Sequence, residues 1–252
     1  MTRAGWKAIA AVGAVAAAVL VGVVRGATDG TDGTDGTDGT EAEDAGNLDV
    51  PLDLVVLGDS FVEHSRDQIG AYAEAQGLDA EVMGLGGTAI CNWEEQLQDH
   101  AADPPAVMVI SFAGNDLPHT CFNPTDESRD AATVAAGYRE ALDEVVALFD
   151  DAGSELYAVV PPPIRDVQFE ERAAAMRVMY AEAAADLPSL HLIDSATQLD
   201  PDGTGFHESL PCAPWDTDCP ATGEVVVRQT DGIHVTPAGA ERYARAIVDG
   251  LS

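Results

Sequence analysis

The chain has 252 residues, of which 46% are hydrophobic, so it can bury a sizeable core and global disorder is excluded. It carries 44 acidic against 12 basic residues, a net charge of −32, and Lys7 is the only lysine. Such a surface repels nucleic acid and anionic lipid headgroups, which excludes both as partners of the folded part, and it fits either salt adaptation or a biased genome composition.

The first segment, residues 1–27, has the pattern of an export sequence. Arg3 and Lys7 precede 17 uncharged residues, Ala8 to Val24. As a helix this run spans about 25 Å, near the lower limit for crossing a bilayer. We expect an uncleaved membrane anchor or a cleaved signal peptide. In both cases the positively charged end stays in the cytoplasm, so the rest of the chain is exported. A buried helix is the weaker alternative. The rest of the chain is then secreted or held at the cell surface, and only this segment contacts a membrane.

The next segment, residues 28–50, is built on a Thr-Asp-Gly repeat. Glycine and like-charge repulsion favour an open chain, so we expect a disordered acidic linker. Calcium binding is an alternative, because aspartates recur every third residue. The repeat lacks a closing glutamate, however, so a spacer is the preferred interpretation.

Residues 51–252 alternate short apolar runs with longer amphipathic stretches. Continuous apolar runs are typical of strands that are buried on both faces of a sheet. Alternation of strand and helix favours right-handed crossovers and a parallel sheet. The five predicted strands lie at residues 54–57, 81–85, 106–112, 156–160 and 190–193.

Three helices are indicated between or after these strands. Apolar residues at helical spacing between 134 and 149 predict one, and residues 168–186 predict another. The last begins at Thr236, which suits an N-cap, with Pro237 in the first helical position. The fold class is therefore α/β, a three-layer sandwich around a mostly parallel five-stranded sheet.

Four cysteines form an even set that allows three disulfide pairings. Cys212 and Cys219 are close in sequence, so the shortest loop closure joins them and leaves Cys91 with Cys121. Zinc is the alternative, but no spacing matches a C-x-x-C pattern, and an exported chain favours disulfides.

Three short motifs follow predicted strands, and a fourth lies just before the last predicted helix. "GDS" contains Ser60 after the first strand, "GLGGT" contains Gly87 after the second, "GND" contains Asn115 after the third, and "DGIH" joins Asp231 to His234. Each has an ordinary explanation as a turn, a cap or a loop. Because parallel strands end at one edge of a sheet, we expect all four to meet there.

Together these motifs, in this order, resemble the SGNH (GDSL-type) hydrolase family over residues 52–250. The resemblance implies a flavodoxin-like SGNH hydrolase fold and makes Ser60 the nucleophile, His234 the base and Asp231 the residue that orients it. The oxyanion hole would be formed by Ser60, Gly87 and Asn115.

The implied chemistry is sound on its own terms. A serine needs an imidazole to take its proton, and a carboxylate fixes the tautomer of that ring. A glycine allows close approach of the backbone, and an amide donates without titrating. Phe61 and Val82 depart from the residues common in the family. We read Asp59 as a hydrogen-bonding turn residue rather than the triad carboxylate.

The sequence therefore predicts an exported serine esterase that cleaves O-acetyl or other short acyl esters of glycans or small molecules through an acyl-enzyme. No metal or cofactor is expected, and we expect a monomer. Alternatives are an O-acyltransferase with the same triad, a lipid or lysophospholipid esterase, and a non-catalytic surface-binding module. Trp93 and Trp215 offer faces for sugar rings, although each is equally suited to packing.

Overall fold

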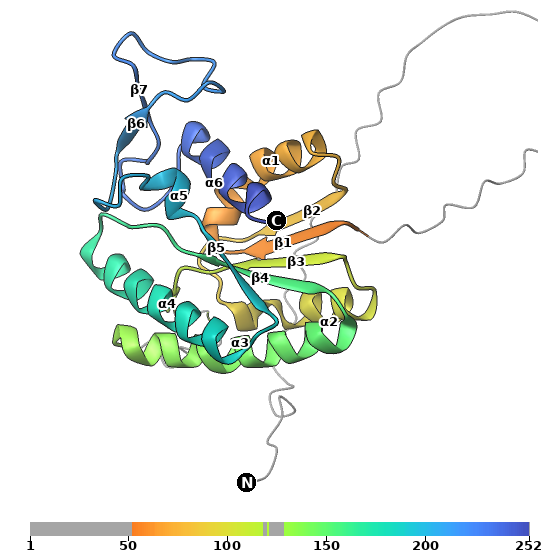
Figure 1. Ribbon diagram of the computed structural model, residues 1–252. Helices are drawn as coiled ribbons and strands as arrows, with labels where there is room; N and C mark the ends of the chain where they lie inside the picture. Colours follow the sequence, from red (N-terminus) through yellow and green to blue (C-terminus); the bar gives the residue numbers. More distant parts are fainter. Residues whose placement is uncertain (1–51, 118–119, 121–128, 252) are drawn as a thin grey trace, which may run out of the picture. The chain divides into compact units, whose positions relative to one another are not determined.

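The computed structural model describes residues 52–117, 120 and 129–251. Within this part, five parallel strands form one sheet in the order β2-β1-β3-β4-β5 (Figure 1), which confirms the predicted fold class. The predictions for residues 1–27 and 28–50 lie outside the described residues. The strands are β1 (Leu54–Gly58), β2 (Ala80–Gly84), β3 (Val107–Ser111), β4 (Glu155–Val160) and β5 (Leu190–Asp194).

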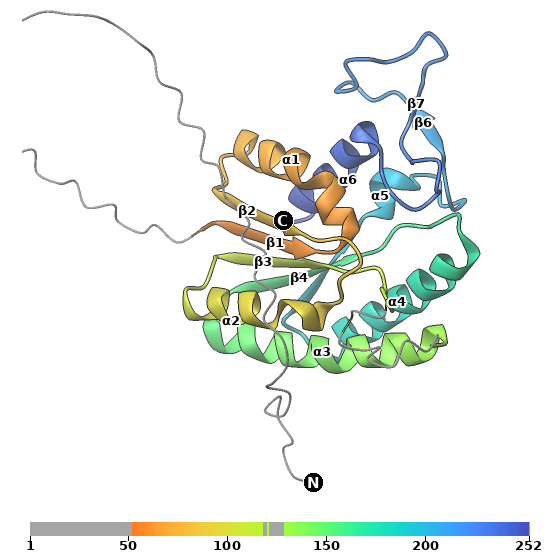
Figure 2. The same ribbon diagram turned by 180° about the vertical axis from the view of Figure 1, so that it is seen from behind.

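Helices cover both faces of this sheet (Figures 1 and 2). One face carries α1 (Ser60–Ala75), α5 (Ala196–Leu199) and α6 (Pro237–Asp249); the other carries α2 (Glu94–Ala102), α3 (Ala131–Ala152) and α4 (Val167–Asp186), with a 3-10 turn η1 (Ile90–Trp93) before α2. Along the described ranges, no helix combines the length and apolar character needed to cross a membrane.

The sheet separates two hydrophobic cores. Along β1, Val55 and Leu57 pack toward α3, whereas Leu54 and Val56 pack toward α1 and α6. Because side chains alternate between the faces of a strand, a strand covered on both sides needs apolar residues at every position. All five residues of β1 are buried, whereas the edge strands β2 and β5 are partly exposed.

The last helix begins as predicted. Thr236 is the N-cap of α6, its hydroxyl accepts a hydrogen bond from Gly239 N at 3.2 Å, and Pro237 occupies the first turn. A Cβ on Gly239 would lie 2.0 Å from the carbonyl oxygen of Val227. Glycine at this position therefore lets α6 pack directly against the preceding loop.

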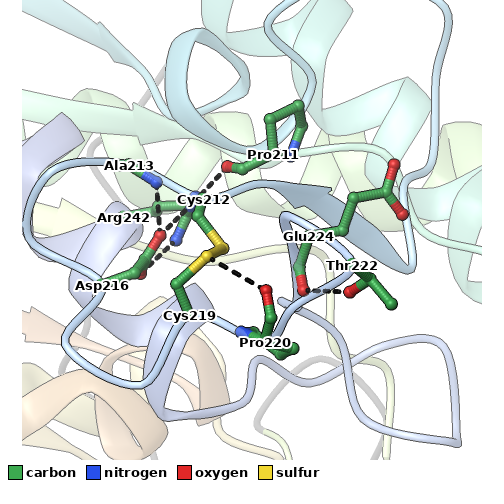
Figure 3. The surroundings of a disulfide bond; sticks show 9 residues. All are labelled: Pro211, Cys212, Ala213, Asp216, Cys219, Pro220, Thr222, Glu224 and Arg242. Atoms are coloured by element: carbon green, nitrogen blue, oxygen red, sulfur yellow. Dashed lines mark hydrogen bonds and ion pairs between the residues drawn. A yellow bond between two sulfur atoms is a disulfide. The ribbon is translucent and has the colours of Figure 1, made fainter.

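A second, two-stranded antiparallel sheet was not predicted. It pairs β6 (Ser209–Pro211) with β7 (Glu224–Val226), and the loop between them projects beyond α6 in Figure 1. The predicted Cys212–Cys219 disulfide is confirmed within this loop (Figure 3). Cys91 is also disulfide-bonded, and its predicted partner, Cys121, lies outside the described residues.

Candidate active site

Ser60 lies where the central strand β1 passes into α1. Gly58 ends the strand, and a Cβ there would lie 2.3 Å from the carbonyl oxygen of Ser111 on β3, so only glycine allows this approach. Asp59 is the N-cap of α1, and its Oδ1 accepts a hydrogen bond from Phe61 N at 3.1 Å. Ser60 is therefore held at the N-terminus of a 16-residue helix, where the dipole favours developing negative charge.

Asp59 also contacts the loop that follows β3. Its Oδ2 accepts hydrogen bonds from Ala113 N at 2.8 Å and from Asn115 Nδ2 at 3.2 Å. The side chain is buried, and this burial raises its pKa to about 6, although the hydrogen bonds from Ala113 and Phe61 and the charge of His234 oppose the shift. The predicted turn role of Asp59 is confirmed and extends to positioning Asn115.

The loop after β2 brings Gly87 to the same place. Gly87 has a φ of 75°, a conformation that favours glycine. The preceding residue, Gly86, donates its N–H to Glu63 Oε2 at 2.8 Å. On the other side, Thr88 Oγ1 donates to Leu85 O and accepts from Trp93 Nε1 at 3.0 Å. The backbone around Gly87 is thus anchored from both sides.

Asn115 joins this loop to the nucleophile turn. Besides its bond to Asp59, its Nδ2 donates to Thr88 O at 3.0 Å, and its carbonyl oxygen accepts from Tyr138 OH at 3.1 Å. The two amide hydrogens therefore already have two acceptors. To stabilise an oxyanion, Asn115 must share one of these hydrogens with the substrate oxygen.

His234 and Asp231 form a direct pair, as the spacing predicts. His234 Nδ1 lies 2.7 Å from Asp231 Oδ2, and Asp231 Oδ1 accepts the backbone N–H groups of Ile233 and His234 at 2.8 and 3.0 Å. Partial burial raises the pKa of Asp231, but these hydrogen bonds outweigh it and lower the pKa below its ordinary value. Because an ionised carboxylate only accepts, Nδ1 carries the hydrogen, and Nε2 of the neutral ring is left as an acceptor.

The turn that carries this pair is fixed from outside. Gly232 has a φ of 73°, and its carbonyl oxygen accepts from Arg165 N at 2.9 Å. The Arg165 guanidinium donates to Thr230 O. These contacts hold the base at the edge of the sheet.

One cavity of about 360 Å³ unites these residues. Ser60, Gly87, Asn115 and His234 all line it. Asp231 is not among its lining residues and reaches the site through His234. No hydrogen bond joins Ser60 Oγ to the His234 ring among those of the described residues, and such bonds often tighten only when substrate is bound. The apolar part of the lining comes from Phe61, Ala113, Leu117, Ile164, Phe169 and Ile233.

Two cavity residues were missed in the sequence. Glu63 holds Gly86, and the ring of His64 lies 4.6 Å from the ring of His234, centroid to centroid. They follow Ser60 by three and four residues. This spacing places them on the same face of α1 as Ser60, and it is the sequence signal that could have identified them.

The tryptophans differ in role. Trp93 is buried in the core, so it packs rather than stacking on sugar rings. Trp215 lines a second cavity together with the disulfide loop. No residue of this loop lines the Ser60 cavity.

One group of potential metal ligands converges within the described ranges: Asp200, Asp202 and His207, whose ligand atoms lie within 4.8 Å of one another. His207 Nε2 is 3.2 Å from Asp200 Oδ1 and 3.0 Å from Asp202 Oδ1. The ring lies between the two carboxylates as a hydrogen-bonded partner, and none of the three lines the Ser60 cavity.

Comparison with known proteins assigns the sequence to a family. A family model described as "Protein of unknown function (DUF459)" matches residues 53–250. The chain belongs to the DUF459 family. This is an SGNH-like family, so the resemblance seen in the motifs is confirmed. No curated protein matches the sequence.

Solved structures support the same fold. A provisionally assigned SGNH hydrolase from Slackia heliotrinireducens superposes with a TM-score of 0.54 at 17% identity, covering 81% of this chain and 100% of that one. The acetyl xylan esterase AlAXEase gives 0.52 at 16%, covering 79% and 100%. The C-terminal catalytic domain of Streptococcus pneumoniae peptidoglycan O-acetyltransferase A gives 0.50 at 14%, covering 80% and 93%. These DUF459 and SGNH relationships establish a hydrolase-type fold.

Proposed function

We propose that this DUF459 protein is an exported serine esterase that removes O-acetyl or other short acyl groups from glycans or small molecules. The observation that carries the proposal is the cavity lined by Ser60 and His234, with Asp231 hydrogen-bonded to Nδ1 of the His234 ring. Cleavage of an acyl ester needs a nucleophile, a base and donors for the oxyanion, and the residues proposed for these roles line one cavity, which supports the proposal.

In the first half of the reaction, His234 Nε2 takes the proton of Ser60 Oγ as this oxygen bonds to the ester carbonyl carbon. The carbonyl oxygen becomes an oxyanion, which the N–H groups of Ser60 and Gly87 and the amide of Asn115 stabilise. Asp231 stabilises the imidazolium. The C–O bond to the alcohol then breaks, and the proton on Nε2 passes to the leaving alkoxide.

In the second half, water replaces the alcohol. His234 takes a proton from water as the hydroxide oxygen bonds to the acyl carbon, the Ser60 ester bond breaks, and Ser60 Oγ regains the proton. The products are a carboxylic acid and free enzyme. No step requires a metal or cofactor.

The apolar lining supports a short acyl group. Leu117, Ile164 and Phe169 surround a cavity of about 360 Å³, the lower end of the range for small-molecule sites. The confirmed Cys212–Cys219 disulfide supports an oxidising compartment and hence export.

The deciding experiment combines turnover with labelling. Ser60→Ala is expected to abolish hydrolysis of p-nitrophenyl acetate and labelling by a fluorophosphonate, and His234→Ala is expected to do the same. His207→Ala is the matched control, because His207 also pairs with aspartates but lies outside the cavity. Wild-type turnover by Ser60→Ala would refute the mechanism.

O-acyl transfer is the second candidate, because an O-acetyltransferase domain shares the fold. The two reactions share the acyl-enzyme and differ in whether water or a sugar hydroxyl accepts the acyl group. Product analysis with an acetyl donor, with and without glycan acceptors, distinguishes them. Acetylated glycan as the main product would replace the esterase proposal by a transferase.

A further inference from the structure

A second cavity, of about 590 Å³, is lined, like the active-site cavity, by α1 and by the segment that leads into α6. Its walls come from the disulfide loop, β7, α6 with its N-cap Thr236, and one residue of α1, Gln68. None of its lining residues has a role in the chemistry proposed at Ser60. The lining is mixed and includes an indole ring, carboxylates and threonine hydroxyls.

The two cavities follow one another along the same helix face. Ser60 and His64 line the first cavity and Gln68 lines the second. A spacing of four residues keeps these side chains on one face of α1, over about 12 Å from Ser60 to Gln68. Likewise, His234 lines the first cavity and Thr236, two residues later, lines the second. The separation of Ser60 and Gln68 along α1 is longer than one sugar ring.

An aromatic residue is fixed in the second cavity. The Arg245 guanidinium carbon lies 4.1 Å from the ring centroid of Trp215 and 4.2 Å from that of Tyr72 on α1. Arg245 Nη2 also pairs with Glu241 Oε1 at 2.7 Å. These contacts hold the indole in place through cation–π attraction.

The loop that carries Trp215 is itself rigidly attached (Figure 3). The Cys212–Cys219 disulfide closes it, and Arg242 on α6 donates to both carboxylate oxygens of Asp216 at 3.0 and 2.8 Å. Arg242 also donates to Pro211 O at 3.0 Å. The Arg242–Asp216 pair is almost fully buried. Trp215 is therefore presented on a preorganised support, which lowers the entropic cost of binding.

The chemistry of this cavity selects a neutral polyhydroxylated ligand. Arg245 lies over one face of the Trp215 ring, and the part of the indole that lines the cavity can pack against the C–H groups of a sugar ring. The carboxylates of Asp218 and Glu241 can accept hydrogen bonds from hydroxyl groups. Its arginine, Arg245, is already paired with Glu241, so nothing on the lining favours an anion.

We propose that the Trp215 cavity is a glycan subsite that binds a neutral oligosaccharide chain whose acylated sugar lies at Ser60. This inference rests on the proposed esterase function and adds the size and charge of the substrate. It predicts that the enzyme acts on sugars within a chain better than on free monosaccharides.

The first test measures binding without catalysis. Calorimetric titration of Ser60→Ala with two neutral chains, xylotetraose and fully N-acetylated chitotetraose, is expected to detect binding of at least one of them. Adding Trp215→Ala should weaken that affinity about tenfold, the scale of one lost aromatic contact, and Trp215→Phe should restore most of it. Absence of binding to both oligosaccharides would overturn the subsite.

The second test measures turnover. Wild-type kcat/KM should be higher for acetylated xylotetraose or chitotetraose than for the corresponding acetylated monosaccharide. Trp215→Ala should reduce this preference about tenfold through KM, measured against p-nitrophenyl acetate as reference. Gln68→Tyr, which places a bulky ring in the second cavity from the side of α1, should have the same effect if Trp215→Ala folds poorly. Val178→Ala, an exposed change on α4, is the control.

The outcomes separate the two proposals. No turnover of p-nitrophenyl acetate by wild type, together with oligosaccharide binding, would refute the esterase and retain the glycan site. Equal losses on the oligosaccharide and on p-nitrophenyl acetate would show that Trp215 is merely structural and overturn the subsite. Preference for acetylated oligogalacturonate over the neutral chains would overturn the inferred charge.

Discussion

Replacing Asp59 by asparagine tests how the site is held together. Three donors surround this carboxylate: Phe61 N at one oxygen, and Ala113 N and Asn115 Nδ2 at the other. A carboxylate accepts at both ends, whereas an amide has one accepting and one donating end. In either orientation, Asp59→Asn therefore places its NH2 group against at least one N–H, at a cost of about 1–3 kcal/mol.

The same substitution removes a buried charge. Burial raises the pKa of Asp59 from 3.8 to about 6, which makes ionisation about 3 kcal/mol more costly in the folded than in the unfolded chain. Between these two pKa values the folded protein holds a proton that the unfolded chain has lost. Lowering the pH therefore stabilises the wild type through Asp59, by about 1.4 kcal/mol from pH 8 to pH 5, and this gain is lost in Asp59→Asn.

Urea unfolding of both proteins at pH 8 and pH 5 measures this effect. Because the other carboxylates are common to both chains, the difference between wild type and variant isolates Asp59. When the pH is lowered from 8 to 5, the free energy of unfolding of the wild type should rise by about 1.4 kcal/mol relative to that of Asp59→Asn. A difference that stays constant with pH would refute the raised pKa.

Activity provides the second readout of Asp59→Asn. Loss of the bonds to Ala113 and Asn115 frees the loop that supplies an oxyanion donor, and we expect kcat for p-nitrophenyl acetate to fall about 10²-fold. Asp130→Asn is the matched control, since Asp130 caps α3 in the same manner but is exposed, and neither it nor its partner Thr133 lines the cavity. Unchanged kcat in Asp59→Asn would show that Asn115 needs no such support.

Three further substitutions test other contacts. Asp231→Asn should reduce kcat about 10⁴-fold in steady-state assays, because an amide no longer fixes the His234 tautomer, and a loss below tenfold would contradict the pairing. Asn115→Ala should lower kcat by about 10²–10³ with folding intact by circular dichroism, and an effect on KM alone would exclude an oxyanion role. Gly239→Ala should destabilise the fold by about 1–3 kcal/mol in urea titrations, because its Cβ would meet Val227 O at 2.0 Å; an unchanged midpoint would show that α6 shifts freely.

The sheet could be predicted because its pattern is local. Each strand is a short apolar run, and β1 is buried at every position, so periodicity and composition carry the information. The start of α6 could be predicted for the same reason, because its signal consists of two adjacent residues, the N-cap Thr236 and Pro237. By contrast, β6 and β7 have three residues each, and such short segments have no detectable periodicity.

The triad candidates could be named because they stand in short motifs, but their supports could not. Glu63 bonds to Gly86, which is 23 positions away in the sequence. Arg165, in the loop between β4 and α4, bonds to Gly232. These residues come from ordinary polar stretches. Their contacts depend on which loops the sheet order brings together, and a pairing of that kind leaves no mark in the surrounding sequence.

Asp59 illustrates how both levels combine. In the sequence it is a capping residue beside a candidate nucleophile, and in the structure that cap is confirmed. Its second oxygen, however, links the nucleophile turn to Asn115, which in turn bonds to Thr88 in the loop of Gly87. One buried carboxylate thus connects the three loops that would supply oxyanion donors. A site built this way requires an acceptor at residue 59 for its geometry, which explains how the fold tolerates a buried charge whose pKa is raised to about 6.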